Sequence, residues 1–264
     1  MTGPLVRLGI RVRAERAELA LADLLPILRE GAEEREIDND VEYVLYAPAG
    51  ELPRPDDIRA MLGDALVDVS SEPVPDGWER RWHDFLRPVR VGDLVVRPPW
   101  VAGSPGDLVI DPGVYFGAGT HATTRLCLEL MLDTRPDGAL CDWGAGTGVL
   151  AVAAARLGFG PVTAVEVDPG APAVIEANAA RNRVRVAAAR QDLLDREPPW
   201  APTVTANLTR ELLLDVAVVV ERPPERMLVS GVLVEEADEV AAAFAPLREV
   251  QRIEADGWAG MLLA

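Results

Sequence analysis

The sequence predicts an α/β fold with a mostly parallel sheet, preceded by a smaller α+β domain. From residue 139 onward, short apolar strands alternate with helical segments, which is typical of a parallel sheet covered on both faces. Before residue 73, strands and helices also alternate, but no glycine-rich turn interrupts them. We therefore expect an N-terminal α+β domain at 1–72, a linker helix and connector at 73–104, and a larger α/β domain at 105–264.

Composition and charge limit the class of protein. The 264 residues are 49% hydrophobic and 26% charged, which is ordinary for a soluble chain, and no run approaches the ~20 apolar residues of a membrane helix. No signal peptide is evident, so we expect a cytoplasmic protein. The net charge is −17, and every basic residue is arginine. This acidity argues against direct nucleic-acid binding and allows a basic protein partner, although solubility alone explains it equally well.

The N-terminal domain shows elements without visible chemistry. Leu5–Arg13 alternates apolar and polar residues like a half-buried strand, and 21–28 carries leucines at helical spacing before Gly31. A strand at 41–46, a helix opened by Pro53 and Pro55, and a strand at 66–69 follow. We interpret this domain as a recognition or packing module. In the connector, Trp78, Trp82 and Phe85 recur at i, i+4 and i+7, a stripe that favours packing over ligand contact.

The larger domain is predicted to hold a regular series of elements. A strand is expected at 108–110, and a helix follows the loop 111–121. Further strands are expected at 139–142, 162–167, 184–188, 204–206, 226–229, 249–253 and 258–262, with helices at 149–157, 169–181, 211–220 and 235–244. Cys127 and Cys141 fall inside such elements and are interpreted as core residues. With only His83 and His121 beside them, we expect no metal site.

A glycine-rich turn at Asp142 to Gly148 reads D-x-G-x-G-x-G between a strand and a helix. Glycines let a ligand approach the backbone, and the helix N-terminus offers unpaired N–H groups, so we expect an anionic or nucleoside-bearing ligand. The third glycine comes one residue earlier than in dinucleotide-binding turns. The acid before the first glycine makes the turn similar to motif I of class I S-adenosylmethionine (AdoMet) methyltransferases.

Polar residues at the following strand ends are candidates for the same site. Glu166 could bind both hydroxyls of a ribose, and we favour it over Asp168, whose Asp-Pro sequence is typical of a helix N-cap. Asp192 is a weaker candidate, because a loop acid is an equally good interpretation. Asn207 follows the fourth strand, where it could bind the cofactor or an amine or simply form a turn.

The segment 116–124, F-G-A-G-T-H-A-T-T, follows D-P-G at Asp111 to Gly113 and closely resembles the signature of the PrmA family. Its members methylate the ribosomal large-subunit protein numbered eleven. The resemblance covers nearly the whole chain and implies a Rossmann-like class I methyltransferase fold with a seven-stranded, mostly parallel sheet. It also implies transfer of methyl groups from AdoMet to lysine side chains and the α-amine of that protein. On this basis we expect a monomer that binds its basic substrate through the N-terminal domain.

The same resemblance assigns the site residues. It implies cofactor contacts at Thr124, Gly144, Glu166 and Asn207, and the turn adds Gly146. No catalytic residue is assigned, although Asn207 is a candidate for positioning the amine. We interpret His121, within the loop signature, as structural rather than as a general base.

Departures from the family pattern leave alternatives open. Glu166 replaces the usual aspartate, Ala118 and Ala122 replace a threonine and a proline, and Asn207 to Arg210 replaces Asn-Ile-Leu-Ala. The altered turn motivates a second hypothesis, methylation of a different protein or of a small amine. A third hypothesis is a cofactor-binding protein without catalysis, or a nicotinamide enzyme.

Overall fold

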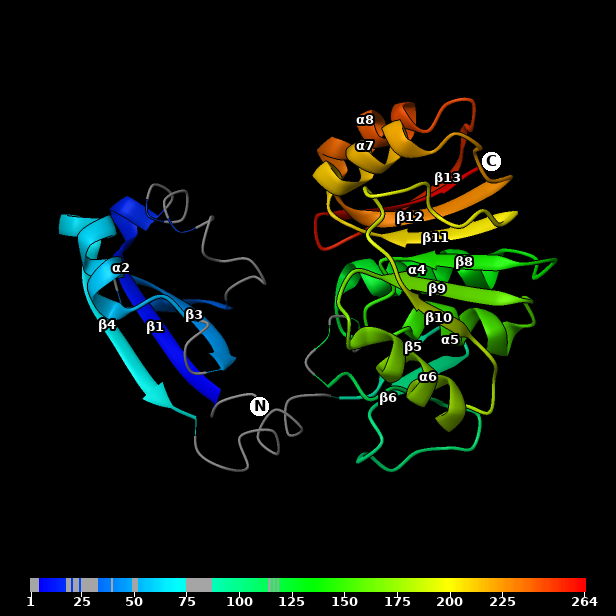
Figure 1. The fold of residues 1–264 in the computed structure, drawn as a ribbon. Coiled ribbons are helices and arrows are strands. Elements are labelled where there is room, and N and C mark those ends of the chain that lie inside the picture. Colours follow the sequence, from blue (N-terminus) through cyan, green and yellow to red (C-terminus); the bar gives the residue numbers. More distant parts are fainter. Residues whose placement is uncertain are drawn as a thin grey trace. The chain divides into compact units, whose positions relative to one another are not determined.

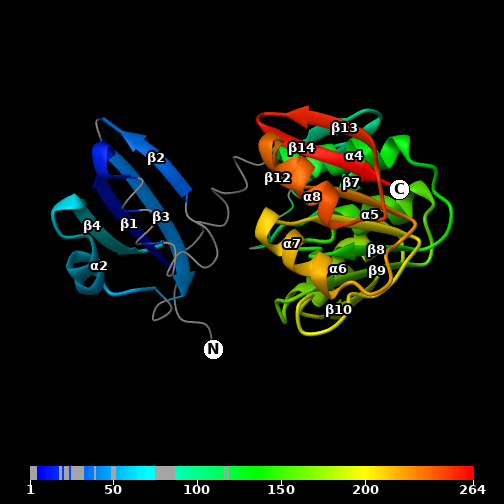
Figure 2. The same ribbon diagram turned by 90° about the horizontal axis from the view of Figure 1, so that it is seen from above.

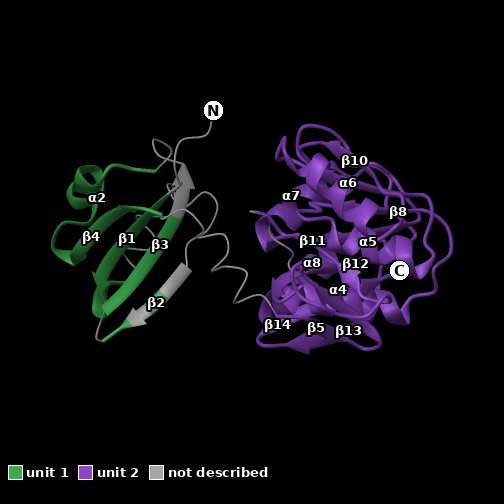
Figure 3. Cartoon of the chain, turned by 90° about the horizontal axis from the view of Figure 1, so that it is seen from below, with its two compact units in different colours: residues 1–82 green, residues 83–264 purple. Residues whose placement is uncertain are grey.

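The chain divides into two compact units, Met1–Trp82 and His83–Ala264 (Figure 3). The computed structural model describes residues 5–17, 20, 24, 33–38, 40–48, 52–74, 87–113, 115, 117 and 119–264. The division lies within the connector expected at 73–104. The aromatic stripe Trp78, Trp82 and Phe85 lies outside the described residues. So does most of the helix expected at 21–28, of which Leu24 is described and buried.

The first unit contains a four-stranded antiparallel sheet in the order β2-β3-β1-β4. Its elements are β1 (Leu5–Arg13), η1 (Ala14–Arg16), β2 (Glu33–Ile37), β3 (Asp40–Pro48), α2 (Pro55–Leu62), η2 (Gly63–Ala65) and β4 (Leu66–Pro73). Leu8, Ile10 and Val12 of β1 are fully buried on one face, in one core with Ile58 of α2. On the other face Arg7 pairs with Glu42, which confirms the alternation predicted for β1.

Strand β2 was not expected, because its sequence EEREI carries four charged residues. It forms at the edge of the sheet by pairing along β3, from Glu33 opposite Val44 to Ile37 opposite Asp40. An edge strand tolerates charged side chains, and this pairing comes from tertiary structure rather than from the strand's own pattern.

The second unit contains a seven-stranded sheet in the order β10-β9-β8-β11-β12-β14-β13 and a three-stranded sheet β5-β6-β7 (Figures 1 and 2). In chain order its strands are β5 (Val89–Val91), β6 (Leu94–Arg97), β7 (Leu108–Val109), β8 (Leu140–Trp143), β9 (Val162–Glu166), β10 (Ala187–Arg190), β11 (Thr203–Asn207), β12 (Arg226–Leu233), β13 (Glu249–Ala255) and β14 (Trp258–Leu263). Its helices are α4 (Ala122–Asp133), α5 (Val149–Leu157), α6 (Ala171–Arg181), α7 (Arg210–Val219), η3 (Val234–Glu236) and α8 (Ala237–Ala243). In the seven-stranded sheet, β14 runs antiparallel to β12 and β13, and the other pairings are parallel. In the three-stranded sheet, β5 and β6 are antiparallel and β6 and β7 are parallel.

Two hydrophobic cores cover the two faces of the large sheet. Helices α4, α5 and α6 contribute Leu128, Val152 and Ile175 to one core, together with β5 to β7. Helices α7 and α8 contribute Leu213 and Val240 to the other. The sheet is therefore buried on both faces, as its apolar strands predict. None of the helices in the described part of the chain has the length and apolar run needed to cross a bilayer.

Among the element boundaries that differ from the prediction, two have a clear local cause. Helix α6 begins at Ala171 rather than 169, because Asp168 accepts a hydrogen bond from the Gly170 N–H and forms a turn before the helix. Gly170, not Asp168, is the N-cap residue, so the predicted cap was wrong. Strand β10 begins at 187 rather than 184, because the Val184 N–H still bonds the Ala179 carbonyl at the end of α6.

Candidate active site

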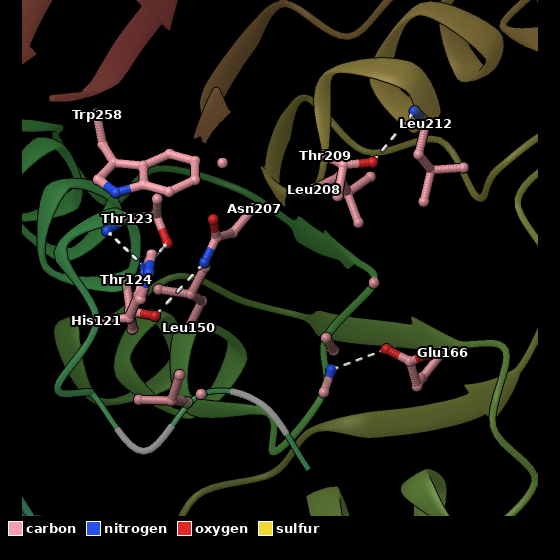
Figure 4. A pocket seen from close by; sticks show the side chains of 16 residues that line it. His121, Thr123, Thr124, Leu150, Glu166, Asn207, Leu208, Thr209, Leu212 and Trp258 are labelled. Carbon is pink, nitrogen blue, oxygen red and sulfur yellow. Dashed lines mark hydrogen bonds between the residues drawn. The ribbon is translucent and has the colours of Figure 1, made fainter. Parts of the chain in front are cut away.

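A cavity of about 420 Å³ opens at the carboxyl edge of the large sheet, within the size range of ligand pockets. Gly144 follows β8, Glu166 ends β9 and Asn207 ends β11, so parallel strands bring these residues to one edge. The loop before α4 and the first residue of β14, Trp258, complete the lining (Figure 4). Ligands of open α/β sheets bind at such an edge.

The glycine-rich turn forms one side of the cavity, in a conformation that requires glycine. Gly144, Gly146 and Gly148 have φ values of +68°, +52° and +79°. A Cβ on Gly144 would come within 2.3 Å of the Leu208 side chain, and a Cβ on Gly148 within 2.8 Å of Ile175. The N–H groups of Gly144 and its neighbour Ala145 bond the Val165 carbonyl. The turn thus presents backbone to the cavity and packs closely against its neighbours.

Glu166 connects the end of β9 to this turn. One carboxylate oxygen accepts the Gly146 N–H at 2.9 Å, and the other accepts the Val167 N–H at 2.8 Å. The side chain is half-buried and lines the cavity. A carboxylate held in this way has lone pairs available for two vicinal hydroxyls. Gly144, Gly146 and Glu166 are called the turn wall below.

Asp142, two residues before Gly144, stabilises the start of the turn wall through buried hydrogen bonds. Its side chain is buried, accepting the Thr205 hydroxyl at 2.6 Å from β11 and the Ala151 N–H at 3.1 Å from α5. Burial raises the pKa of Asp142 to about 7, and the charge of Glu166 acts in the same direction, while the two hydrogen bonds lower it. The acid before the first glycine is therefore a structural tie between two strands and a helix.

Asn178 of α6 and Asn182, the C-cap residue of that helix, bind the segment before α4. Asn182 donates to the Val109 carbonyl and accepts its N–H, at 2.7 and 2.8 Å. Asn178 makes the same pair of bonds to Asp111, at 3.0 and 2.9 Å, and also donates to the Thr147 carbonyl at 2.9 Å. Both asparagines are buried. The two glycine-rich segments of the sequence are thus joined through side chains of one helix.

A direct contact also joins these segments. The Thr147 hydroxyl donates to the Gly117 carbonyl at 2.9 Å, and a Cβ on Gly117 would lie 2.7 Å from that hydroxyl oxygen. Gly117 has a φ of +110°, so glycine is needed for both conformation and space. Phe116 and Ala118 lie outside the described residues.

The start of α4 forms the opposite side of the cavity. His121 is the N-cap residue, and its Nδ1 accepts the Thr123 N–H at 3.4 Å and lies 2.8 Å from the Thr123 hydroxyl. Thr124 is buried, and its hydroxyl accepts a bond of 3.4 Å from the Asn207 side-chain amide. The amide oxygen of Asn207 lies on the Trp258 side of the residue (Figure 4). Thr124, Asn207, His121 and Trp258 are called the side-chain wall below.

Gly231 positions Asn207 from the neighbouring strand. The Leu208 N–H bonds the Ser230 carbonyl, and a Cβ on Gly231 would come within 2.1 Å of the Leu208 carbonyl oxygen. Gly231 has a φ of +92° and lies at a register shift between β12 and β14. Its absent side chain lets the Asn207–Leu208 turn pass across β12.

His121 is not arranged as a proton acceptor toward the cavity. Because Nδ1 accepts the Thr123 N–H, a neutral ring carries its proton on Nε2 and donates there. Partial burial lowers the pKa of His121, as does the charge of Arg125, so the neutral form is favoured. This supports the structural interpretation of His121, as does its T-shaped contact with Trp258, with ring centroids 5.2 Å apart.

The structure brings five of the six predicted cofactor residues to one cavity. Thr124, Gly144, Gly146, Glu166 and Asn207 all line it. Asp192 does not. It lies in a separate cavity of about 340 Å³, and its carboxylate accepts the Leu194 N–H.

Sequence reasoning missed Trp258, Gly231 and Asn178 as contributors to the site. Trp258 follows the Asp256-Gly257 turn, and that turn was the available signal that it would lie at a sheet edge. A glycine inside the strand Arg226–Leu233 was a second signal, because such a glycine often marks a close backbone approach. Nothing local distinguishes Asn178 from a surface asparagine of α6.

Cys127 and Cys141 are buried in the core as expected, and burial raises the pKa of Cys141 to about 11. Among the described residues, no cluster of three or more histidine, cysteine, aspartate or glutamate side chains could hold a metal ion.

Comparisons with known proteins agree on one family. The family model described as ribosomal protein L11 methyltransferase (PrmA) matches residues 60–263. The ribosomal protein L11 methyltransferase of Pelotomaculum thermopropionicum is 39% identical over 216 residues, which cover 77% of this chain and 70% of the relative. That of Cupriavidus necator is 32% identical over 271 residues, which cover 90% of each chain.

A solved structure supports the fold. The crystal structure of ribosomal protein L11 methylase from Lactobacillus delbrueckii subsp. bulgaricus aligns with a TM-score of 0.60 at 24% identity, covering 67% of this chain and 97% of that chain. At this identity the likeness concerns the fold. The second unit has the class I methyltransferase fold that the sequence predicted, with a seven-stranded, mostly parallel sheet.

Proposed function

This chain belongs to the ribosomal protein L11 methyltransferase (PrmA) family, and on that premise we propose that it transfers methyl groups from AdoMet to lysine side chains and the α-amine of ribosomal protein L11. The observation that carries the proposal is the convergence of the glycine turn, Glu166 and Asn207 on one cavity beside the loop that bears the family signature. The family is one of methyltransferases, and AdoMet is the donor that fits this cavity.

The lining residues match the chemistry of this donor. Glu166 offers a carboxylate for ribose hydroxyls, and Gly144 brings bare backbone to the cavity while packing against Leu208. The described lining contains one carboxylate and neither arginine nor lysine, which suits a ligand with positive charge better than a pyrophosphate. This favours AdoMet over a nicotinamide dinucleotide.

When bound, AdoMet supplies a methyl group on a positively charged sulfur. The attacking amine would have to be uncharged, so the substrate ammonium would first lose a proton to water, because His121 donates rather than accepts at Nε2. The methyl group would then pass from sulfur to nitrogen, the electron pair of the broken carbon–sulfur bond would stay on sulfur, and the methylated nitrogen would carry the positive charge. The protein's part is to exclude water and to align the amine through Asn207 and the wall around it.

The residues that depart from the family turn do not themselves indicate another substrate. Thr209 caps α7 by accepting the Leu212 N–H, and Arg210 pairs with Glu239 at 2.6 Å. Their polar groups are used within the fold. Methylation of a different protein or a small amine therefore remains an outcome of the test rather than a second proposal.

The test is methyl transfer from labelled AdoMet to purified L11, followed by identification of the labelled residues by mass spectrometry. The chain contains no lysine, so any methyl-lysine must come from the substrate. We expect label in L11 with wild type and strongly reduced label with Glu166→Ala. Label in another protein or in a small amine of a cell extract, with none in L11, would instead support the alternative substrate. Tight binding of NAD with no binding of AdoMet would overturn the proposal.

We further propose that the enzyme is a cytoplasmic monomer that binds L11 through the N-terminal unit. The net charge of −17 supports attraction of a basic protein. The KM for L11 should therefore rise with ionic strength while the affinity for AdoMet changes little. Gel filtration tests the oligomeric state, and a KM that is independent of salt would contradict the electrostatic part.

A further inference from the structure

The segment before α4 packs against the three-stranded sheet at a single glycine. Gly117 and His121 of this segment line the cavity, whereas Gly119 between them does not and is buried. The three atoms nearest to the Cβ position of Gly119 all belong to Val96, at 3.0, 3.2 and 3.7 Å. Gly119 has a φ of +86°, so glycine is needed for both conformation and space. Val96 therefore supports the segment at a residue that does not itself line the cavity.

Val96 is held in place by the strands around it. It is fully buried in β6, opposite Leu108 of β7. The next residue, Arg97, pairs with Asp107 at 2.9 Å through largely buried side chains, and its carbonyl accepts the Ile110 N–H at 2.9 Å. Strand β6 cannot shift along β7 without breaking these bonds. The valine is thus a rigid support rather than a side chain that follows the segment.

The position of Gly119 bears on the cofactor residues that follow it. His121, two residues later, is the N-cap residue of α4, and it lines the cavity with Thr123 and Thr124. Consecutive Cα atoms lie about 3.8 Å apart, so a displacement of Gly119 reaches the N-cap with little loss. The contact with Val96 therefore helps to fix where α4 begins and where Thr124 lies in the cavity.

Resting on the proposed methyl transfer from AdoMet, we propose that Val96 is a positioning residue for the cofactor. Its γ-methyl groups set the place of the Gly119 backbone, and this backbone sets the start of α4. Val96 and Gly119 form a size-matched pair, in which a branched side chain on β6 requires that the segment carry none. The affinity for AdoMet thus depends on a residue of the three-stranded sheet that lies outside the cavity.

The first test measures AdoMet binding to full-length variants by calorimetry, without L11. Val96→Ala removes both γ-methyl groups and should raise the dissociation constant about fivefold. Val96→Thr keeps the shape of the side chain, so this constant should stay within about twofold of wild type although the buried hydroxyl lowers the melting temperature.

Val91→Ala is the matched control for lost core volume. Val91 is as buried as Val96, but it lies in β5, which pairs with β6 and not with β7. Val91→Ala should lower the melting temperature as much as Val96→Ala does, and leave the dissociation constant of AdoMet within about twofold of wild type.

A reciprocal change at Gly119 tests the pair directly. Gly119→Ala places a Cβ 3.0 Å from Val96 at a φ of +86° and should raise the dissociation constant about tenfold. Combined with Val96→Ala, the overlap is relieved, so the double variant should also show about tenfold rather than the about fiftyfold of independent effects. Gly113→Ala measures strain alone, because Gly113 has a φ of +53° and no atom within 4 Å of its Cβ position. It should raise the constant less than Gly119→Ala does.

These binding measurements separate the inference from the proposed function. Equal effects of Val96→Ala and Val91→Ala on AdoMet affinity, or independent effects of Val96 and Gly119, would overturn the inference while leaving the methylation of L11 intact. The expected pattern of AdoMet affinities without methylation of L11 would support the role of Val96 and count against the proposed substrate.

Discussion

The turn wall and the side-chain wall of the cavity are formed by different kinds of chemical group. The turn wall consists of backbone and one carboxylate, and all its residues lie between 144 and 166. The side-chain wall consists of a hydroxyl, an amide and two rings, drawn from residues 121 to 258. A ligand at the turn wall is therefore bound by groups whose positions depend on local conformation. A ligand at the side-chain wall meets groups whose positions depend on packing between distant elements.

This difference suggests where the chain can vary. A glycine turn presents the same backbone surface whatever side chains surround it, which suits a cofactor that never changes. Side chains can be exchanged one at a time, which suits a wall that selects a substrate. Four predictions test this contrast, beginning with the largest expected effect.

Gly231→Ala should displace the side-chain wall and destabilise the protein most. The new Cβ would lie 2.1 Å from the Leu208 carbonyl oxygen at a φ of +92°. We expect the free energy of unfolding to fall by roughly 3 to 5 kcal/mol, from strain and steric overlap together. Urea denaturation measures it.

Gly257→Ala is the matched control for this prediction. Gly257 also has a positive φ, +81°, but no atom lies within 4 Å of its Cβ position. It should cost about 1 to 2 kcal/mol, the penalty of a left-handed residue alone. Equal losses for the two variants would mean that the Leu208 contact carries no weight.

Glu166→Ala should weaken AdoMet binding at the turn wall without disturbing the side-chain wall. Charge-assisted hydrogen bonds contribute about 1.5 to 3 kcal/mol each, so we expect the dissociation constant of AdoMet to rise roughly 10- to 100-fold. Asp168→Ala, two residues away with its carboxylate on Gly170 and Tyr115, should bind AdoMet nearly as wild type does. Calorimetry on both variants checks this, and a larger loss for Asp168→Ala would reverse the assignment.

Asp142 should make stability depend on pH. Its folded pKa of about 7 lies above the ordinary value of ~3.9, so between these values the folded protein holds a proton that the unfolded chain has lost. The free energy of unfolding therefore falls as pH rises through this window, by at most about 1.4 kcal/mol per pH unit. Asp142→Asn cannot titrate, so wild type should lose stability relative to the variant between pH 5 and 7. A difference that stays constant across these pH values would contradict the prediction.

His121→Ala should have the smallest effect, a loss of about 1 kcal/mol from the missing N-cap of α4. His121→Asn should recover that stability but not the ring contact with Trp258. The lowered pKa of His121 means that its contribution to stability is lost as pH falls below about 6.5, when Nδ1 must become a donor. Thermal unfolding at pH 5.5 and 7.5 measures this, and a wild type that loses no more stability than His121→Ala would refute it.

The turn wall could be predicted from sequence because its causes are local. The D-x-G-x-G-x-G pattern lies between an apolar strand and an apolar helix, and α5 spans 149–157 as expected. Glu166 follows because a carboxylate at the next strand end must lie beside the turn. Thr124 was identified through the family resemblance alone. Asn207 was a candidate from its place at a strand end, and the resemblance favoured a cofactor contact over a simple turn.

The side-chain wall was less accessible because tertiary pairing creates it. Trp258 was expected only as part of a final strand. Its place in the cavity requires β14 to lie between β12 and β13 in the sheet, so that the order of the strands differs from their order in the chain. Strands β5 and β6 were not expected, since three- and four-residue strands between prolines and glycines carry no clear periodicity. Strand β2 was not expected because four of its five residues are charged.

The bonds from Asn178 and Asn182 to the preceding segment match two different periods. Residues four apart in a helix are about 6 Å apart along its axis, and residues two apart in an extended chain span about 6.7 Å. Asn178 therefore binds the backbone of Asp111, and Asn182 binds the backbone of Val109, two residues earlier. Both asparagines bond the N–H and the carbonyl of their partner, as a neighbouring strand would. Because the bonds reach backbone groups, they tolerate a change of side chain at Val109 or Asp111 but not an insertion or deletion between them. The spacing of the two asparagines along the chain thereby fixes where the segment before α4 begins relative to the glycine-rich turn, to which Asn178 is also bonded.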